Sequence, residues 1–167
     1  EESAFVPGSP RGSLIRFASV LGSHGCSFNC MYCVYPVVFG KWRGRSPKKI
    51  VDDVEVLVKD YGVKIVWFED QAFSMDVNRA TAICDEIIKR RVEVSWACET
   101  RADKLPVELL KKMKTAGCTR IQLGIETGDP ELFKKLGKSA CQMENVTKNI
   151  RAIQEEGILV ETNFIVG

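Results

Sequence analysis

Residues 63–98 read VKIVWFEDQAFSMDVNRATAICDEIIKRRVEVSWAC. Two short runs in this stretch, 63–68 and 92–98, are rich in β-branched and aromatic residues, which predicts strands. Between them, residues 76–90 carry apolar side chains at helical spacing, which predicts an amphipathic helix. Strand, helix and strand in this order form a βαβ unit, whose two strands run parallel.

The same alternation continues toward both ends of the chain. We expect strands at 14–21, 63–68, 92–98, 119–125 and 158–166, and helices at 47–60, 76–90, 106–115, 130–136 and 143–156. The segment 22–46 is expected to be a long loop. Strands that alternate with helices predict one parallel sheet with right-handed crossovers.

The pattern within strands indicates a barrel. In 92–98, Val94, Trp96 and Cys98 share one face, while polar residues share the other. An open doubly wound sheet is apolar on both faces, whereas a barrel interior that holds a ligand can be polar. Polar residues gather where the predicted strands end, which is where parallel α/β folds place their sites. We therefore predict an α/β fold, a partial (β/α) TIM-type barrel with five parallel strands.

Length and composition fit one globular domain. The chain has 167 residues, of which 45% are hydrophobic and 28% charged. These values are ordinary for a folded domain and exclude disorder, collagen and coiled coil. The net charge of +2 is too balanced to indicate nucleic acid binding by itself. Residues 1–13 are expected to be an extended arm or linker remnant, and 14–167 a domain cut from a longer chain.

Seven cysteines without an export signal indicate reduced thiols or metal ligands in a cytoplasmic protein with no membrane segment. Three of them, Cys26, Cys30 and Cys33, form a C-x3-C-x2-C triplet. Closely spaced thiolates suit a soft metal or an iron–sulfur cluster. The alternative is structural zinc with His24 as fourth ligand. Three cysteines on a four-iron cluster would leave one iron open for substrate. The other four are expected to be buried (Cys84, Cys98) or incidental (Cys118, Cys141).

The triplet, with Tyr32 before its last cysteine, resembles the signature of the radical S-adenosylmethionine (SAM) superfamily. Further segments agree with that family in order: 67–70 (WFED), 100–103 (TRAD), 122–128 (QLGIETG) and 163–167 (NFIVG). The run is most similar to the elongator and methylthiotransferase-like core and to radical SAM proteins that carry a cobalamin-binding domain.

The resemblance implies a chemistry. Cys26, Cys30 and Cys33 would hold a [4Fe–4S] cluster whose open iron chelates SAM. An external electron donor would supply one electron, which cleaves SAM to methionine and a 5′-deoxyadenosyl radical that abstracts hydrogen from the substrate. Cobalamin would come from a domain outside this chain. The substrate, a small molecule or tRNA, stays open.

The resemblance also implies roles for residues near the predicted strand ends. Glu69 or Asp70 would bind the SAM amino group, and Glu126 the ribose hydroxyls. Arg101 would bind the methionine carboxylate or form a structural ion pair with Glu99 or Asp103. Tyr32 would pack by the adenine or shield the cluster. Gly124 would allow close approach inside the barrel, and Ile165 belongs to the last SAM motif.

Three alternatives and expectations complete the interpretation. The same cysteines could serve a non-catalytic zinc or iron–sulfur electron-transfer module. The cations at 41–49, around Trp42, could contact RNA or phosphate, or form a solvated loop.

The family barrel has six strands, so the last strand is expected to be an open edge, and the truncated chain is expected to self-associate.

Overall fold

A computed structural model describes residues 15–138 and 143–166. Its main sheet has five parallel strands in chain order: β1 (Phe17–Val20), β4 (Ile65–Phe68), β5 (Ser95–Thr100), β6 (Cys118–Glu126) and β7 (Leu159–Phe164). The predicted parallel sheet is confirmed. The predicted arm at 1–13, and Cys141, lie outside the described residues.

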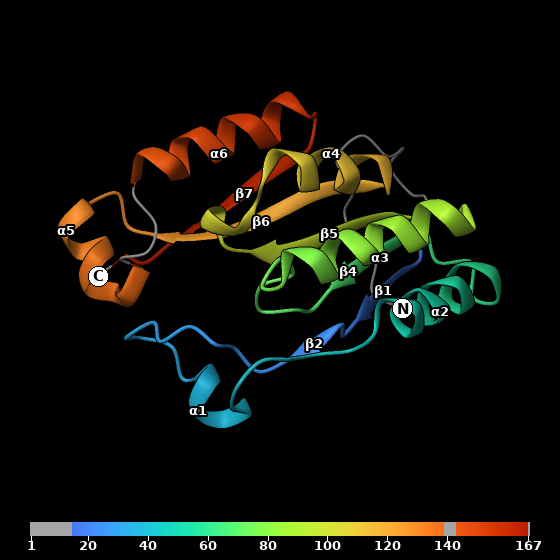
Figure 1. Cartoon of the computed structure of the whole chain (residues 1–167), viewed down its shortest axis with the longest axis horizontal. Helices are drawn as coiled ribbons and strands as arrows, with labels where there is room; N and C mark the ends of the chain where they lie inside the picture. The colour runs from blue at the N-terminus through green and yellow to red at the C-terminus, as the bar shows by residue number, and fades with distance from the viewer. Residues whose placement is uncertain (1–14, 139–142, 167) are drawn as a thin grey trace.

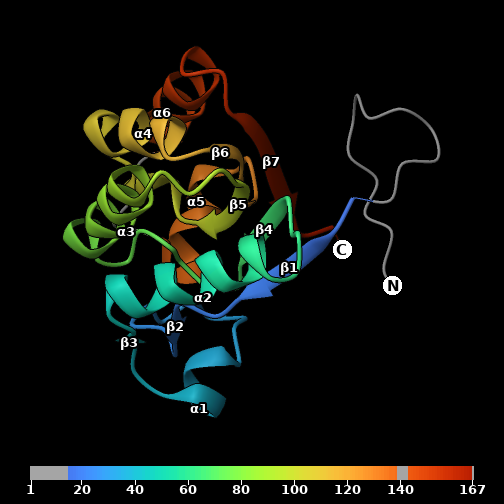
Figure 2. The same cartoon turned by 90° about the vertical axis from the view of Figure 1, so that its right-hand side faces the viewer.

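The long helices lie on one side of this sheet (Figure 2). They are α2 (Pro47–Lys59), α3 (Val77–Arg90), α4 (Val107–Thr115) and α6 (Met143–Glu155), and neighbours in this order pack against each other. The short helix α5 (Pro130–Phe133) follows β6. Strands that follow one another in space and sequence, with helices on one side only, are the arrangement of a barrel wall. The predicted partial barrel is therefore confirmed (Figure 1).

Two strands begin later than predicted, for a reason that lies in the preceding helices. Val63 and Val92 were expected to open strands, but their amides donate to Leu57 and Ile87, inside α2 and α3. Such bonds satisfy the carbonyls at the carboxyl end of a helix. Both valines therefore close helices, and the strands β4 and β5 begin at Ile65 and Ser95.

The segment 22–46 is more structured than the predicted loop. It contains a short antiparallel pair, β2 (Ser23–His24) and β3 (Arg43–Gly44), and the helix α1 (Tyr35–Phe39). Elements this short carry no periodicity that a sequence pattern could reveal. The paired strands form a stem, and residues 25–42 form an excursion from it that includes all three cysteines of the triplet.

Three aromatic rings form the centre of the core. Phe68, Phe73 and Trp96 pack with ring centroids 5.1–5.3 Å apart, a separation typical of favourable aromatic pairs. The indole of Trp96 donates to the Ala116 carbonyl at 2.8 Å. Phe73 lies on the loop after β4, and its amide donates to the carbonyl of Glu99. This packing holds the β4–α3 loop over the carboxyl end of β5.

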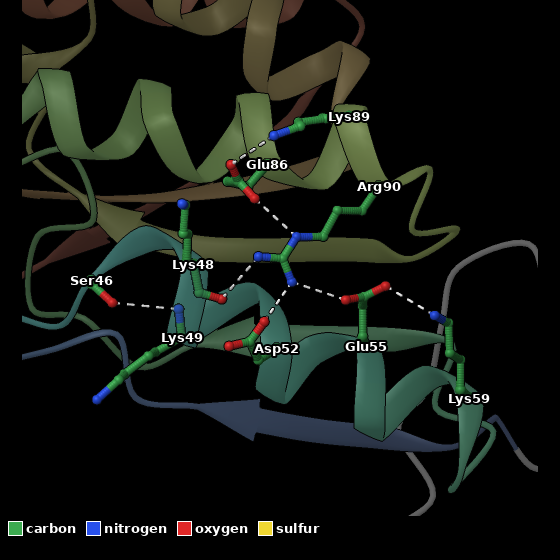
Figure 3. A network of polar contacts seen from close by, with 9 residues as sticks. All are labelled: Ser46, Lys48, Lys49, Asp52, Glu55, Lys59, Glu86, Lys89 and Arg90. Carbon is green, nitrogen blue, oxygen red and sulfur yellow. Dashed lines mark hydrogen bonds and ion pairs between the residues drawn. The ribbon is translucent and has the colours of Figure 1, made fainter.

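An ion-pair network joins α2 and α3 on the outer surface (Figure 3). Arg90 of α3 contacts Asp52 at 2.6 Å and Glu55 at 2.9 Å, both on α2, and Glu86 of its own helix at 2.9 Å. These bonds raise the pKa of Arg90. The network adds surface ion pairs to the packing of α2 against α3.

β7 pairs with β6 along one side, and no described strand lies on its other side. Its exposed apolar residues include Leu159 and Phe164, and the following Val166 is 95% exposed. The expected open edge is therefore present. Among the described residues, no helix is long and apolar enough to cross a membrane.

Candidate functional site

The three cysteines of the triplet lie on the excursion between β2 and β3. All three thiols are free and half-buried. The amide of Cys26 donates to Gly40 at 3.1 Å, and the amide of Cys33 donates to Cys30 at 3.0 Å, so the backbone turns back on itself around the thiols. The excursion therefore presents Cys26, Cys30 and Cys33 from one folded loop, which we call the cysteine loop (residues 25–42).

Asp70 and Arg79 attach the stem of this loop to the barrel. The carboxylate of Asp70, 1% exposed, accepts from the amide of Gly22 at 3.0 Å and from the hydroxyl of Ser23. Arg79 donates to the carbonyls of Gly22 and Arg45, and its guanidinium lies 3.5 Å from Asp70. Asp70, one of two candidates for the SAM amino group, is thus fully engaged in holding the stem.

A second attachment comes from the turn Lys134–Lys138 after α5. The amide of Met31 donates to the carbonyl of Leu136 at 3.1 Å. Gly137 has φ +83°, and a Cβ there would lie 2.6 Å from the carbonyl oxygen of Asn29. Any larger residue would be strained and would push the cysteine loop away, so this turn and the loop fit together only through a glycine.

Arg101 makes the third attachment. Its guanidinium pairs with Asp103 at 2.8 Å and lies 4.0 Å from the ring centroid of Phe28. One of its nitrogens is 4.0 Å from the Cys30 sulfur. The structural ion pair with Asp103 is therefore present. Burial raises the pKa of the neighbouring Cys26 thiol, as do Cys30 and Cys33, while the positive charge of Arg101 opposes this shift.

A cavity of about 180 Å³ separates the cysteine loop from the strand ends. Its walls combine thiols, carboxylates, cations and aromatic rings: Cys26, Phe28, Cys30, Tyr32, Cys33, Tyr35, Gln71, Glu99, Thr100, Arg101, Gly124, Glu126 and Lys138. The structure thus brings together the three cysteines, Tyr32, Arg101, Gly124 and Glu126 of the predicted site.

Glu126 is at the centre of the polar wall. Its carboxylate accepts from the Lys138 ammonium at 2.9 Å, and both side chains are almost fully buried. A Cβ at position 124 would lie 2.6 Å from this carboxylate, so Gly124 leaves the room that the pair needs. Glu126 has φ +71°, a conformation that costs a non-glycine residue about 1 kcal/mol. Burial and a hydrogen bond to Glu126 raise the pKa of Tyr32.

Three predicted site residues lie outside the cavity wall. Asp70 is buried at the stem. Glu69 is exposed beside it and accepts from the Ser19 hydroxyl at 2.8 Å. Ile165 is 54% exposed, and only its amide reaches the site, donating to the backbone of Glu126 at 2.9 Å.

Two charged wall residues were missed or passed over by sequence reasoning. Lys138 follows several similar lysines, and no local pattern marks it as the one that returns to the site. Glu99 was considered only as a strand-end carboxylate and as a possible ion-pair partner of Arg101, which pairs with Asp103 instead. Burial and repulsion from Glu126 and Glu69 raise its pKa, while Lys138 lowers it. The alternation of β5 could have identified Glu99, since it shares the open face of the sheet.

The donor set of the loop suits an iron–sulfur cluster. Three thiols line one cavity, and the guanidinium of Arg101 lies 4.0 Å from the Cys30 sulfur. In the described part of the chain, no three His, Cys, Asp or Glu side chains converge on a single ion. His24, the fourth ligand of the zinc alternative, is exposed on the stem. A four-iron cluster instead places each thiolate on its own iron.

The fold and the cavity define a parallel α/β barrel domain with three cysteine thiols gathered at the carboxyl ends of its strands. The family model of the radical SAM superfamily matches residues 20–167. The chain therefore belongs to the radical SAM superfamily. Relatives among the methylthiotransferases and the cobalamin-dependent enzymes confirm the two resemblances noted in the sequence.

One curated relative is the anaerobic magnesium-protoporphyrin IX monomethyl ester cyclase of Cereibacter sphaeroides, 32% identical over 92% of this chain and 26% of that protein. The radical SAM methyltransferase TsrM of Kitasatospora setae superposes with a TM-score of 0.82 at 22% identity, over 90% of this chain and 31% of TsrM. The cobalamin-dependent radical SAM enzyme OxsB gives 0.75 at 26% identity, over 88% and 23%. The chain spans about a third or less of the curated relatives it matches.

Replacing Asp70 with Asn should destabilise the protein by about 3 kcal/mol, because Arg79 would keep a buried charge without its partner. The same variant should retain less iron, since the stem of the cysteine loop loses its attachment. Chemical denaturation and iron analysis measure the two effects. Asp53→Asn is the matched control, because Asp53 pairs with the partly exposed Arg45. Equal stability of the two variants would contradict the assigned role of Asp70.

Replacing Glu99 with Gln should raise the thermal midpoint of the SAM-free protein at neutral pH. Because its pKa is raised in the folded state, the ionisation of Glu99 lowers stability as the pH rises above the ordinary pKa of Glu, and the loss is complete above the raised pKa. The advantage of the variant should therefore disappear as the pH falls below about 4.3, the ordinary pKa of Glu, where the carboxyl is neutral in both states. Glu108→Gln, at an exposed position, should show no such pH-dependent gain.

Proposed function

We propose that this chain is the catalytic core of a radical SAM enzyme. One observation carries the proposal: three half-buried thiols, two half-buried carboxylates and two buried cations line one cavity at the carboxyl ends of the strands. When bound, a [4Fe–4S] cluster and SAM supply a 5′-deoxyadenosyl radical that abstracts hydrogen from the substrate. The protein binds and orients both groups and excludes water.

The charges of the cavity suit the functional groups of SAM. The thiolates of Cys26, Cys30 and Cys33 hold the cluster. The carboxylate of Glu126 would accept hydrogen bonds from the ribose hydroxyls. Hydrogen bonds to an ionised acceptor are stronger than those between neutral groups.

The remaining polar groups suit the methionine end of SAM. Arg101 and Lys138 are the cations that can face its carboxylate. With Asp70 engaged at the stem, Glu69 is the candidate that we retain for the amino group, and the neighbouring Glu99 adds negative charge for the same end. Tyr32 shields the cluster side of the cavity, and Ile165 supports Glu126 through its backbone.

We infer that the whole protein also uses cobalamin, bound by a domain outside this chain. The relative OxsB has been solved with aqua-cobalamin and SAM bound, and it is 26% identical over most of this chain. The cyclase relatives are named for a magnesium tetrapyrrole, which supports a small organic substrate, while the methylthiotransferase relatives support tRNA or a ribosomal protein. A cytoplasmic location fits because reduced thiols and an oxygen-labile cluster persist in reducing compartments.

The proposal is tested by the cluster itself. After anaerobic reconstitution, the protein should bind about four irons. Replacing Cys26, Cys30 or Cys33 with Ala should remove most of the iron–sulfur absorbance, whereas replacing the buried Cys84, Cys98 or Cys118 should not. Addition of SAM should change the spectrum of the loaded protein. Tight zinc binding without iron would instead identify a structural metal module.

Replacing Glu126 with Gln should weaken SAM binding by about 1–2 kcal/mol, the contribution of a charge-assisted hydrogen bond. Calorimetry on the cluster-loaded protein measures the affinity. Glu161→Gln is the control, because Glu161 pairs with Arg120 on the neighbouring strand, outside the cavity wall. Unchanged affinity in Glu126→Gln would remove Glu126 from the SAM site.

We also propose that the isolated chain self-associates through β7. β7 (LVETNF) contains no Lys or Pro, and an open edge strand without such residues is a template for pairing with another chain. Light scattering over a concentration series should show oligomers for residues 1–167, and a form extended by about one αβ unit, roughly 30–60 residues, should not. A monomer at high concentration would show that the edge is protected without that extension.

A further inference from the structure

The face of the sheet opposite the long helices carries side chains from alternate positions of its strands (Figure 2). Glu99 of β5 lines the cavity on this face, so Ala97, two residues earlier on the same strand, shares it. The parallel register places Trp67 of β4 beside Ala97 and beside Ser19 of β1. We call these neighbours, with the next one on β6, the inner row: Ser19, Trp67, Ala97 and Arg120.

The Trp67 side chain does not pack like a core residue. The indole of Trp96, on the helix side of the sheet, is fully buried and donates to the carbonyl of Ala116. Trp67 is only half-buried, and among the described residues none accepts a hydrogen bond from its indole. This N–H group is also not one of the buried polar atoms without a partner, so it reaches solvent. Trp67 therefore offers an unused donor on the open face of the sheet.

The neighbours of Trp67 also argue against a role in filling the barrel. The interior of a (β/α) barrel is usually filled by layers of bulky branched side chains. In the inner row, the residues on either side of Trp67 are the small Ser19 and Ala97. No large side chain of a neighbouring strand stands beside the indole in this row, which leaves room for a ligand there.

Trp67 lies just below the cavity that holds the predicted SAM site. Glu69 follows it by two residues on the same face, and the Glu69 carboxylate accepts from the hydroxyl of Ser19 at 2.8 Å. Two residues along a strand span about 6.6 Å. Burial, Glu126 and Glu69 raise the pKa of Glu99, so these carboxylates lie near one another at the strand ends. A group bound against Trp67 would therefore adjoin the SAM cavity from the side of the amino ends of the strands.

The chemistry of the side chains on this face favours a planar ligand. A tryptophan presents a large, rigid aromatic surface, on which other rings stack favourably. Gln122, the register partner of Glu99, is half-buried, and within the described residues its amide has no hydrogen-bond partner. An amide both donates and accepts, so it suits a ring that carries nitrogen atoms at its edge. A flexible aliphatic chain would use neither the indole face nor the amide.

We propose that Trp67 is a specificity-determining residue that binds substrates through a planar, nitrogen-containing aromatic ring stacked on its indole. The proposal rests on the radical SAM function proposed above, and it names the substrate class of the same site. A free heteroaromatic molecule and a nucleobase of RNA share this chemistry. Stacking changes no bond: Trp67 binds the ring and orients it toward the cavity.

Two other occupants of the Trp67 surface lead to different measurements. If the adenine of SAM stacked on Trp67, removal of the indole would weaken SAM binding. If a part of the whole protein outside this chain covered Trp67, no added ring would bind there. Both alternatives are separated from the proposal by measuring ring binding and SAM binding independently.

The test uses the full-length protein with its cluster reconstituted and SAM at saturation. The small probes are quinoline-6-carboxylate and decahydronaphthalene-2-carboxylate, which share a carboxylate and a similar size but differ in planarity and ring nitrogen. The second source is represented by an adenosine-containing RNA hairpin. The variants are Trp67→Leu and Trp67→Phe, and Tyr61→Leu makes a matched change at an exposed aromatic residue after α2. Equilibrium dialysis measures probe affinity, calorimetry measures SAM affinity, and SAM cleavage by dithionite is assayed separately.

The unsubstituted protein should bind the quinoline or the hairpin, and a bound quinoline should be held about tenfold or more tighter than the saturated acid. Trp67→Leu should lose about tenfold in affinity for the bound probe, the scale of one stacked ring. Trp67→Phe, which keeps a ring, should retain most of it. Tyr61→Leu, and the SAM affinity of every variant, should stay within about twofold of the unsubstituted protein.

The identity of the probe that depends on Trp67 tells the two sources apart, since quinoline indicates a small molecule and the hairpin a nucleobase. The proposal is overturned if neither probe binds, if the saturated acid binds as well as quinoline, or if Trp67→Phe loses as much affinity as Trp67→Leu. Weaker SAM binding in Trp67→Leu would assign the indole to adenine and likewise overturn it. Absence of SAM cleavage in the unsubstituted protein would instead contradict the proposed function, whatever the probes show.

Discussion

The buried contact between Asp70 and Arg79 is the constraint on which the site depends. A loop that carries three thiols has no apolar core of its own, so it must be positioned from outside. Asp70 at the end of β4 and Arg79 in the first turn of α3 bind the backbone of Gly22, Ser23 and Arg45, the residues that flank the stem. These contacts fix the position of the loop relative to the sheet. Because both charges are buried, removing either partner would leave the other as an uncompensated charge inside the protein, which is strongly destabilising.

The opposite wall of the cavity shows how the barrel accommodates charge. The pair formed by Glu126 and Lys138 is shielded from water, and Gly124 provides the space for it. Glu126 retains a left-handed backbone conformation that Gly or Asn would adopt at lower cost. Glu99 adds a carboxylate whose ionisation is opposed by its neighbours. Such local costs are typical of binding sites, where the ligand supplies the compensating interactions.

Sequence patterns predicted the barrel wall well because side-chain burial in it repeats with the periods of a helix and a strand. Apolar spacing in α2 and α3 and alternation in β5 and β6 reflect burial on one face, and local patterns record burial directly. The cysteine triplet was equally easy to recognise, since thiols at this spacing have few uses other than binding a metal or an iron–sulfur cluster. The patterns could not show that Val63 and Val92 end helices, because an apolar residue beside a strand looks like part of it. They also could not assign Asp70 to the stem or bring Lys138 to Glu126, since both contacts join segments whose meeting is decided by the tertiary fold.

The paired stem has a consequence for how this domain can diversify. Because Ser23 lies opposite Gly44, the cysteine loop leaves and re-enters the barrel at one point. A closed excursion of this kind can change in length or surface chemistry without moving β1 or α2, between which it is inserted. The part of the protein that meets other molecules can therefore evolve separately from the part that holds the sheet together. Selection can alter one while the folding of the other is left intact.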